Sequence, residues 1–260
     1  MIDEETEHDF LEDASFDDVI ARYNFDRSLR LILFDAIEII EVALRAKIIN
    51  HLSQAKDSGL WYLDESLFEK MEYYEDFLLD LKYEFERSTE PFAKEYIAKH
   101  LDWDSESMEG DNPDAWMILE VATFGTLSKM YKNLKSQLPQ RATIANEFGL
   151  YSAKELSSWL EAISVLRNII AHHSRLWNRS LAKQPMNIKG HRDKWLNIPF
   201  TDNQKKKPYG VITAMLYLCN AVYPENQIKV KILSLLDNSK DIPYGKLGFT
   251  GNWRNEPIWK

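Results

Sequence analysis

A short segment of the chain gathers side chains that bind phosphate and carry protons. Residues 167–179 read RNIIAHHSRLWNR, so 13 residues hold three arginines and two adjacent histidines. Histidine exchanges a proton near neutral pH, and the planar guanidinium of arginine matches the geometry of phosphate. The segment therefore indicates a site that binds a phosphate and moves a proton, with Arg167, Asn168 and His172 as the candidate catalytic residues.

This set of side chains suits RNA cleavage without a metal ion. The 2′-hydroxyl of the RNA serves as nucleophile, an imidazole transfers the proton and arginine stabilises the crowded phosphorane. Asn168 stands one helical turn before His172, where its amide orients the imidazole or binds a phosphate oxygen. No Cys, Asp or third His has metal-ligand spacing near the adjacent histidines, so we expect no metal and no cofactor. The structural alternative is a cationic helix end that stabilises the helix dipole, with Trp177 stacked on an arginine.

Helical geometry limits how Arg167 and His172 can cooperate. They are five residues apart, which places them about 140° from each other around an ideal helix. They meet only if the helix ends near His172, if the Arg167 side chain curls around the helix, or if two copies of the helix face each other. The third alternative predicts a composite site at a homodimer axis.

Helices are the elements predicted to position this segment. Apolar residues recur at helical spacing from Phe16 to about Leu52, with a break expected near Asn24. Ser152 and Glu155 have the spacing of a capping box at the start of the helix that carries the motif. Further helices are predicted over residues 64–87, 91–101, 114–138 with an interruption at Gly125, 141–148, 152–172, 209–223 and 224–236. No alternating pattern indicates a strand, so the predicted class is all-α.

The remaining segments predict one domain with irregular ends. We expect an acidic tail over 1–15, a single helical domain over 16–240 and an irregular surface tail over 241–260. Within the domain, residues 102–113 are a loop by composition and residues 181–208 are an extended loop with short turns.

Composition restricts the partners and the compartment. The net charge of −9 excludes a general nucleic-acid coat protein, so contact with RNA must be local, through clustered Arg and Lys. The single Cys219 excludes an internal disulfide and favours a reducing cytoplasm. No signal peptide is recognisable and no apolar run approaches the roughly 20 residues of a membrane span, so we expect no membrane partner.

The motif resembles the signature of the Abi-like family of bacterial abortive-infection proteins, of the AbiD/AbiF type, within the HEPN superfamily. Arg167, Asn168 and His172 fall on the positions that the superfamily shares. The resemblance continues in residues 23–45 and 124–128 and covers roughly residues 20–235. The matching residues outside the shared positions are His173, Arg175, Leu176, Trp177, Arg179, the run YNFDR at 23–27, Leu29, Arg30, Ile37, Glu38, Glu41, Arg45 and the run FGTLS at 124–128. Ile170 stands where the family often has Cys.

The resemblance implies a fold, a partner and an activity. It implies an HEPN-like helical bundle with additional helices and a homodimer that brings two Arg–His motifs together. It also implies metal-independent RNA cleavage in defence against phage, with 2′,3′-cyclic phosphate products. The alternatives are a non-catalytic RNA-binding or toxin-neutralising HEPN module, and a motif that serves only dimerisation. A regulatory RNA or protein is a further expected partner.

Several other residues are candidates for supporting or RNA-binding roles. Glu41 and Arg45 have the spacing of a helical ion pair, and Glu41 alternatively orients Arg167 or Arg45. The three consecutive lysines at 205–207 either contact the RNA backbone or belong to a solvated loop. The full supporting set is His173, Arg175, Arg179, Glu41, Arg45, Lys205, Lys206 and Lys207.

Overall fold

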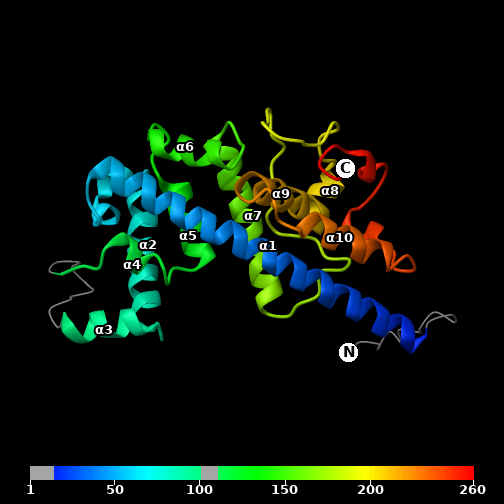
Figure 1. The fold of residues 1–260 in the computed structure, drawn as a ribbon, viewed down its shortest axis with the longest axis horizontal. Helices are drawn as coiled ribbons and strands as arrows, with labels where there is room; N and C mark the ends of the chain where they lie inside the picture. The colour runs from blue at the N-terminus through cyan, green and yellow to red at the C-terminus, as the bar shows by residue number, and fades with distance from the viewer. Residues whose placement is uncertain (1–14, 101–110) are drawn as a thin grey trace, which may run out of the picture.

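The computed structural model describes residues 15–100 and 111–260, and the regular elements in these ranges are helices (Figure 1). No β-strand forms within these ranges, where only two isolated bridges occur. The prediction of an all-α protein is confirmed. The expected acidic tail, apart from Ser15, and most of the expected loop over 102–113 lie outside the described residues.

One long helix, α1 (Phe16–Lys56), spans the length of the molecule (Figure 1). It begins at a capping box, in which the Ser15 side chain accepts the backbone N–H of Asp18. The predicted break near Asn24 is wrong. Asn24 is exposed, and the buried side chains that follow it keep helical spacing from Phe25 onward, so the helix continues through this point.

The shorter helices pack around α1. Figure 1 shows α2, α3 and α4 at one end of α1 and α8, α9 and α10 at the other, with α5, α6 and α7 between them. Their bounds are α2 (Met71–Glu86), α3 (Pro91–Lys99), α4 (Ala115–Ile118), α5 (Phe124–Asn133), α6 (Pro139–Glu147), α7 (Ala153–Ala171), α8 (Asp202–Lys206), α9 (Pro208–Val222) and α10 (Ile228–Asp237).

Several predicted helix boundaries shift because side chains cap the backbone elsewhere. The helix expected from Asp64 begins at Met71, since Asp64 caps a separate 3-10 turn over Glu65–Leu67. The helix expected over 114–138 is two helices, and the second begins after Thr123, whose hydroxyl accepts a backbone N–H of the first turn of α5. Helix α10 begins at Ile228 rather than at residue 224.

The capping box predicted at the start of α7 is absent. Ser152 makes no side-chain cap, and the Glu155 carboxylate instead accepts the backbone N–H of Lys189 at 3.0 Å. Glu155 is buried, so its oxygen satisfies an amide of the packed loop over 181–208 rather than an amide of its own helix. The loop is therefore anchored along α7, and it also contains α8.

The C-terminal segment is irregular but does not lie on the surface as predicted. Phe249, Trp253 and Trp259 are buried, and Tyr209 of α9 contacts the rings of Phe249 and Trp259 at centroid distances of 4.9 and 6.1 Å. Burying large aromatic side chains is strongly favourable. The C-terminal segment therefore packs against α9 and covers it. None of the helices in the described ranges combines the length and apolarity that crossing a membrane requires.

Candidate catalytic loop and groove

The motif straddles the C-terminal end of α7. His172 is the C-cap, and His173 adopts a left-handed conformation with φ of 54°. The backbone N–H of His173 bonds to Ile170 O at 2.9 Å and that of Ser174 to Ile169 O at 3.0 Å. This is a Schellman motif, in which glycine usually takes the left-handed position. Here a histidine takes it, at a cost in backbone strain.

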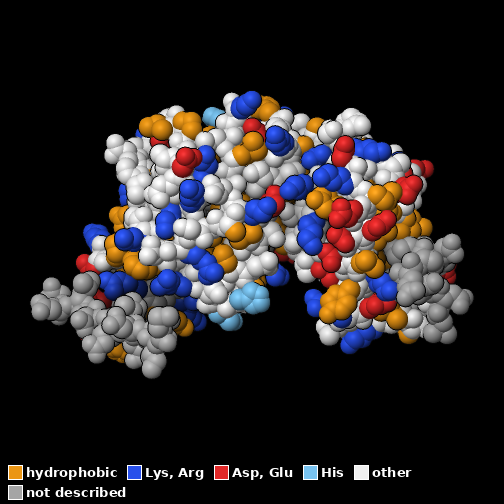
Figure 2. Space-filling view, turned by 180° about the vertical axis from the view of Figure 1, so that it is seen from behind, with side chains coloured by type: hydrophobic (Ala, Val, Ile, Leu, Met, Phe, Trp, Pro, Cys, Tyr) orange, Lys and Arg blue, Asp and Glu red, His pale blue; other side chains and the backbone are white. Residues whose placement is uncertain are grey.

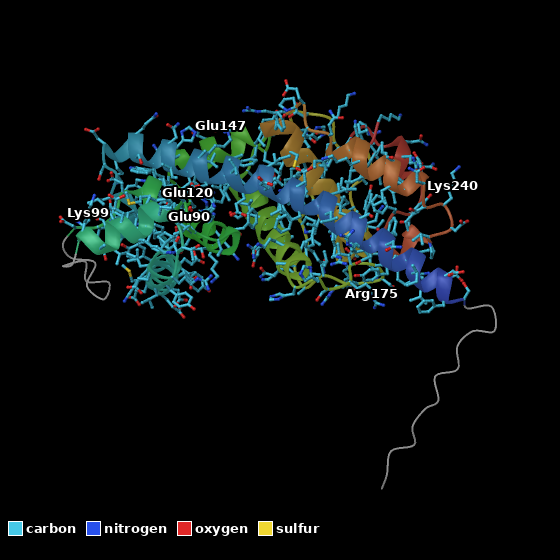
Figure 3. The ribbon with its side chains drawn as sticks, turned by 60° about the horizontal axis from the view of Figure 1, so that its bottom comes forward. Glu90, Lys99, Glu120, Glu147, Arg175 and Lys240 are labelled. Atoms are coloured by element: carbon cyan, nitrogen blue, oxygen red, sulfur yellow. The ribbon has the colours of Figure 1, made fainter. Side chains whose placement is uncertain are left out.

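Both histidines are exposed at this helix end. Figure 2 shows histidine side chains at the lower edge of the molecule, which is indented between them and the part formed by α2 and α3. Arg175 is exposed as well, and Figure 3 shows it on the side of the molecule where α1 begins. The end of α7 therefore presents imidazole and guanidinium groups to solvent.

A buried carboxylate on α1 holds the segment that follows the histidines. Asp26 Oδ1 accepts the backbone N–H groups of Leu176 at 2.9 Å and of Trp177 at 2.7 Å. Asp26 Oδ2 accepts the Nε–H of Arg30 at 3.1 Å. The guanidinium of Arg22 lies 5.8 Å from the centroid of the Trp177 ring. The expected stacking of Trp177 on an arginine is therefore present, and the arginine comes from α1.

Asp26 and Arg30 were not predicted to have a role, although the sequence contains a signal for one. Both stand on the buried face of α1, among Phe25, Leu29 and Leu33. A charged pair at i and i+4 within an apolar stripe must find partners inside the protein. That placement indicates a tertiary contact, but it does not identify the backbone that the pair contacts.

Arg167 and Asn168 line a groove between α2, α5 and α7, which we call the α2–α5–α7 groove. Its volume is about 730 Å³. Its lining comprises Glu69, Lys70, Tyr73, Asp76, Asp80, Glu84, Thr123, Gly125, Thr126, Ser128, Lys129, Lys132, Asn133, Glu161, Ser164, Val165, Arg167, Asn168 and Lys183. The run of residues 124–128 thus contributes the start of α5 to the same groove as the motif.

The cations of the groove differ in their partners. Lys132 and Lys183 both pair with Glu161, at 3.0 and 2.7 Å. Arg167 is half-buried, and no carboxylate of the described chain lies within ion-pair distance of it. Its guanidinium is therefore available to an incoming anion such as a phosphate.

The predicted ion pair on α1 lies close enough to Arg167 for the charges of Glu41 and Arg167 to interact. Arg45 donates to Glu41 at 3.0 Å and to the carbonyl of Ala122 at 3.2 Å. Burial raises the pKa of Glu41, while the positive charges of Arg45 and Arg167 partly oppose that rise. Glu41 thus lies in the field of Arg167 without a hydrogen bond to it among the described contacts.

His173 lines a second cavity, which we call the α1–α7 hollow. Its volume is about 510 Å³. Its lining comprises Tyr23, Arg27, Arg30, Leu31, Phe34, Ile170, Ala171 and His173. Neither this hollow nor the α2–α5–α7 groove is lined by His172. Neither of these two cavities therefore contains both Arg167 and His172, even though His172 directly follows the last residue of α7.

The remaining candidates lie apart from both cavities. Arg179 donates to the backbone oxygen of Arg175 at 3.2 Å. Lys205 pairs with Asp202 at 3.1 Å, and the backbone oxygen of Lys206 accepts the N–H of Leu181. Lys207 is the N-cap of α9. The structure thus does not bring the lysine run beside Arg167, and the run belongs to α8 and its end.

A metal site does not accompany these residues in the described ranges. No group of three or more His, Cys, Asp or Glu side chains is placed there to hold a metal ion. The motif itself supplies imidazoles, guanidinium groups and the Asn168 amide.

Comparison with known proteins places most of this site within one family. Residues 1–178 match the family described as Abi-like protein. This span contains α1, the α2–α5–α7 groove apart from Lys183, and the segment that follows α7 as far as Asn178. No curated protein and no solved structure shows a significant match to the chain.

Proposed function

The chain belongs to the Abi-like protein family, and from this membership, which suggests abortive infection in defence against phage, we propose that it is a metal-independent endoribonuclease. We place it in the HEPN superfamily, near the AbiD/AbiF type. The observation that carries the proposal is the arrangement at the end of α7. His172 is exposed at a helix end, and the turn before it presents Arg167 and Asn168 to an open groove.

The proposed chemistry follows from these groups. The 2′-oxygen of the RNA attacks the adjacent phosphorus, the bond from phosphorus to the 5′-oxygen breaks, and the products are a 2′,3′-cyclic phosphate and a 5′-hydroxyl. His172 serves as general acid or base for the proton that moves. The guanidinium of Arg167 stabilises the charge of the phosphorane, and Asn168 positions the imidazole or a phosphate oxygen.

The proposed site uses two copies, because neither described cavity contains both Arg167 and His172. A helix-end histidine of one copy that faces Arg167 of the other would complete a site. An exposed apolar face on α1 supports such a dimer, since contiguous exposed apolar surface marks interaction sites. This α1 apolar face consists of Phe16, Val19, Ile20, Tyr23, Leu31 and Phe34, and each of these side chains is 42 to 77% exposed.

The spacing of the α1 apolar face is symmetric about residue 25. Phe16 and Phe34 are each nine residues from this point, and Val19 and Leu31 are each six residues from it. An isologous dimer places a residue on one side of the axis against its counterpart on the other. Antiparallel α1 helices crossing near residue 25 would therefore pair these side chains. Tyr23 would then face the arginine at position 27 of the second copy, a cation–π arrangement.

The test is cleavage of RNA by purified protein in the presence of EDTA. We expect His172→Ala to lower the rate about 100-fold or more, the usual contribution of a general acid or base. His191→Ala, which removes another exposed histidine, is the matched control and should keep wild-type activity. Equal cleavage by wild type and His172→Ala, or no cleavage by activated wild type, would overturn the proposal.

The absence of His172 from the lining of the groove that holds Arg167 also favours a second candidate function. This is a non-catalytic RNA-binding or toxin-neutralising module. It predicts that His172→Ala leaves RNA binding and phage resistance intact, while Arg167→Ala weakens RNA binding. RNA binding measured with both variants, beside the cleavage assay, separates the two functions.

A further inference from the structure

We propose that Asp26 is the positioning residue of the catalytic loop, by which we mean residues 172–179. The proposal rests on the proposed RNA cleavage for its kinetic part. Asp26 lies on α1, about 150 residues before the loop in sequence, and is 4% exposed. It therefore acts on the reaction through the backbone it holds rather than by contact with RNA.

The Asp26 carboxylate is committed to three donors. One oxygen accepts the N–H groups of Leu176 and Trp177, and the other accepts the Nε–H of Arg30. Hydrogen bonds to a charged acceptor are stronger than neutral ones, and a buried charge is costly unless it is paired. The three donors together offset the burial of the carboxylate and fix the two loop amides relative to α1.

The loop needs such a contact because its backbone is strained on both sides. His173 and Asn178 both have positive φ, 54° and 55°. Left-handed residues other than glycine persist only where the surrounding structure holds them. Asp26 binds the loop between these two positions, and the buried Leu176 side chain adds a second anchor there. Without Asp26 the loop can relax, which would move the histidines away from the substrate.

Arg30 extends the effect of Asp26 to the α1–α7 hollow. Its Nε–H is held by Asp26, and the residue lines the hollow together with His173. Asp26 therefore fixes the loop that carries the imidazoles and also one cationic wall beside His173.

The experiment compares Asp26→Ala, Asp26→Asn and Leu33→Ala. Leu33 is fully buried on the same helix and has no polar side-chain group to accept the loop amides, so its variant controls for lost stability. Hydrogen exchange of the Leu176 and Trp177 amides is the readout independent of activity. Steady-state RNA cleavage well below all melting temperatures is the second readout.

We expect Asp26→Ala to accelerate exchange at both amides and to lower kcat about 100-fold with little change in KM, as small misplacements of catalytic groups do. Asp26→Asn keeps one oxygen for the two loop N–H groups but turns an NH2 group toward the Arg30 Nε–H, so it should recover only part of the protection and of kcat. Leu33→Ala should lower the melting temperature while leaving kcat and the relative protection of these two amides unchanged.

Two results would overturn the proposal. One is wild-type exchange at Leu176 and Trp177 in Asp26→Ala. The other is an equal fall of kcat in Asp26→Ala and Leu33→Ala. If wild type cleaves no RNA, the proposed function fails, but the exchange measurement still decides whether Asp26 holds the loop.

Discussion

His173 is the residue at which backbone strain and chemistry coincide. Glycine would take its left-handed position without strain, yet the chain has an imidazole there that lines the α1–α7 hollow. Strained residues that persist in a fold are concentrated at functional sites. The strain thus supports a functional role for His173, which the sequence placed only among the supporting residues.

The variant His173→Gly tests this role. Relief of the left-handed strain should raise the free energy of unfolding by about 1 kcal/mol, measured by urea denaturation. RNA cleavage should fall, because the imidazole is lost. His172→Gly is the matched control, since residue 172 has a negative φ of −85° and no such strain to relieve. A His173→Gly protein that is more stable and fully active would show that the imidazole has no role in cleavage.

Glu41 offers a direct measure of the electrostatics behind Arg167. Burial raises its pKa, and the charges of Arg45 and Arg167 oppose the rise. Arg167→Ala should therefore raise the pKa of Glu41 further, as followed by NMR titration of its side chain. Arg175→Ala should leave the pKa unchanged, because Arg175 is not among the charges that act on Glu41. An unchanged pKa in Arg167→Ala would show that the two groups are not coupled.

The same pKa shift has a consequence for stability. A carboxyl whose folded-state pKa is raised holds its proton to a higher pH in the folded chain than in the unfolded chain. The contribution of Glu41 to stability is therefore largest below its unfolded pKa and falls as the pH rises through its folded pKa.

The presence of the helices could be predicted from the sequence more accurately than the residues at which they begin and end. The apolar spacing of α1, the proline at the start of α3 and Gly149 after α6 are local signals, and the structure confirms these helices. The break near Asn24 and the capping box at Ser152 were wrong. Asn24 lies on the exposed side of α1, so it does not disturb the packing of that helix. Glu155 accepts a hydrogen bond from Lys189, a loop residue whose contact the local sequence does not reveal.

The candidate site also has a part that the sequence predicts and a part that it does not. Arg167, Asn168 and His172 are recognisable because they stand close together in sequence. The contact of Asp26 with Leu176 and Trp177 joins segments about 150 residues apart, and the residues of α2 in the groove share no pattern with the motif. Such contacts depend on how the helices pack, which periodicity alone does not specify.

The start of α7 tests whether a distant contact, rather than the predicted local cap, stabilises this helix. Glu155→Ala removes the acceptor of a part-buried amide and should lower the free energy of unfolding by about 1 kcal/mol, with faster hydrogen exchange near Lys189. Ser152→Ala should have little effect, because Ser152 makes no cap. Loss of about 1 kcal/mol in Ser152→Ala, the usual value of an N-cap, would contradict the structure.

At the scale of the whole molecule, α1 links the loop, the hollow and the apolar face. One side of this helix binds the catalytic loop through Asp26, and another exposes the apolar face beside the α1–α7 hollow. The proposed dimer would use that exposed side. The residues that hold the histidines and the residues that join two copies then belong to the same helix.

Charged substitutions on this face should separate the copies. We expect Leu31→Glu and Phe34→Glu to be folded monomers in analytical ultracentrifugation, because a carboxylate in an apolar interface is costly. They should also lose RNA cleavage if the site is shared. Leu79→Glu alters an exposed apolar residue on α2, outside this face, and should leave both properties unchanged. Dimers of wild-type strength in Phe34→Glu would exclude this interface.

In the proposed dimer, Arg167 of one copy acts with His172 of the other. The direct measurement is RNA cleavage by Arg167→Ala and His172→Ala proteins, separately and after they are mixed and allowed to exchange subunits. Each variant alone should be inactive. The mixture should recover about one quarter of the wild-type rate, because half of the dimers are mixed and each of these has one intact site. A mixture as inactive as its parts, despite proven subunit exchange, would contradict the shared site.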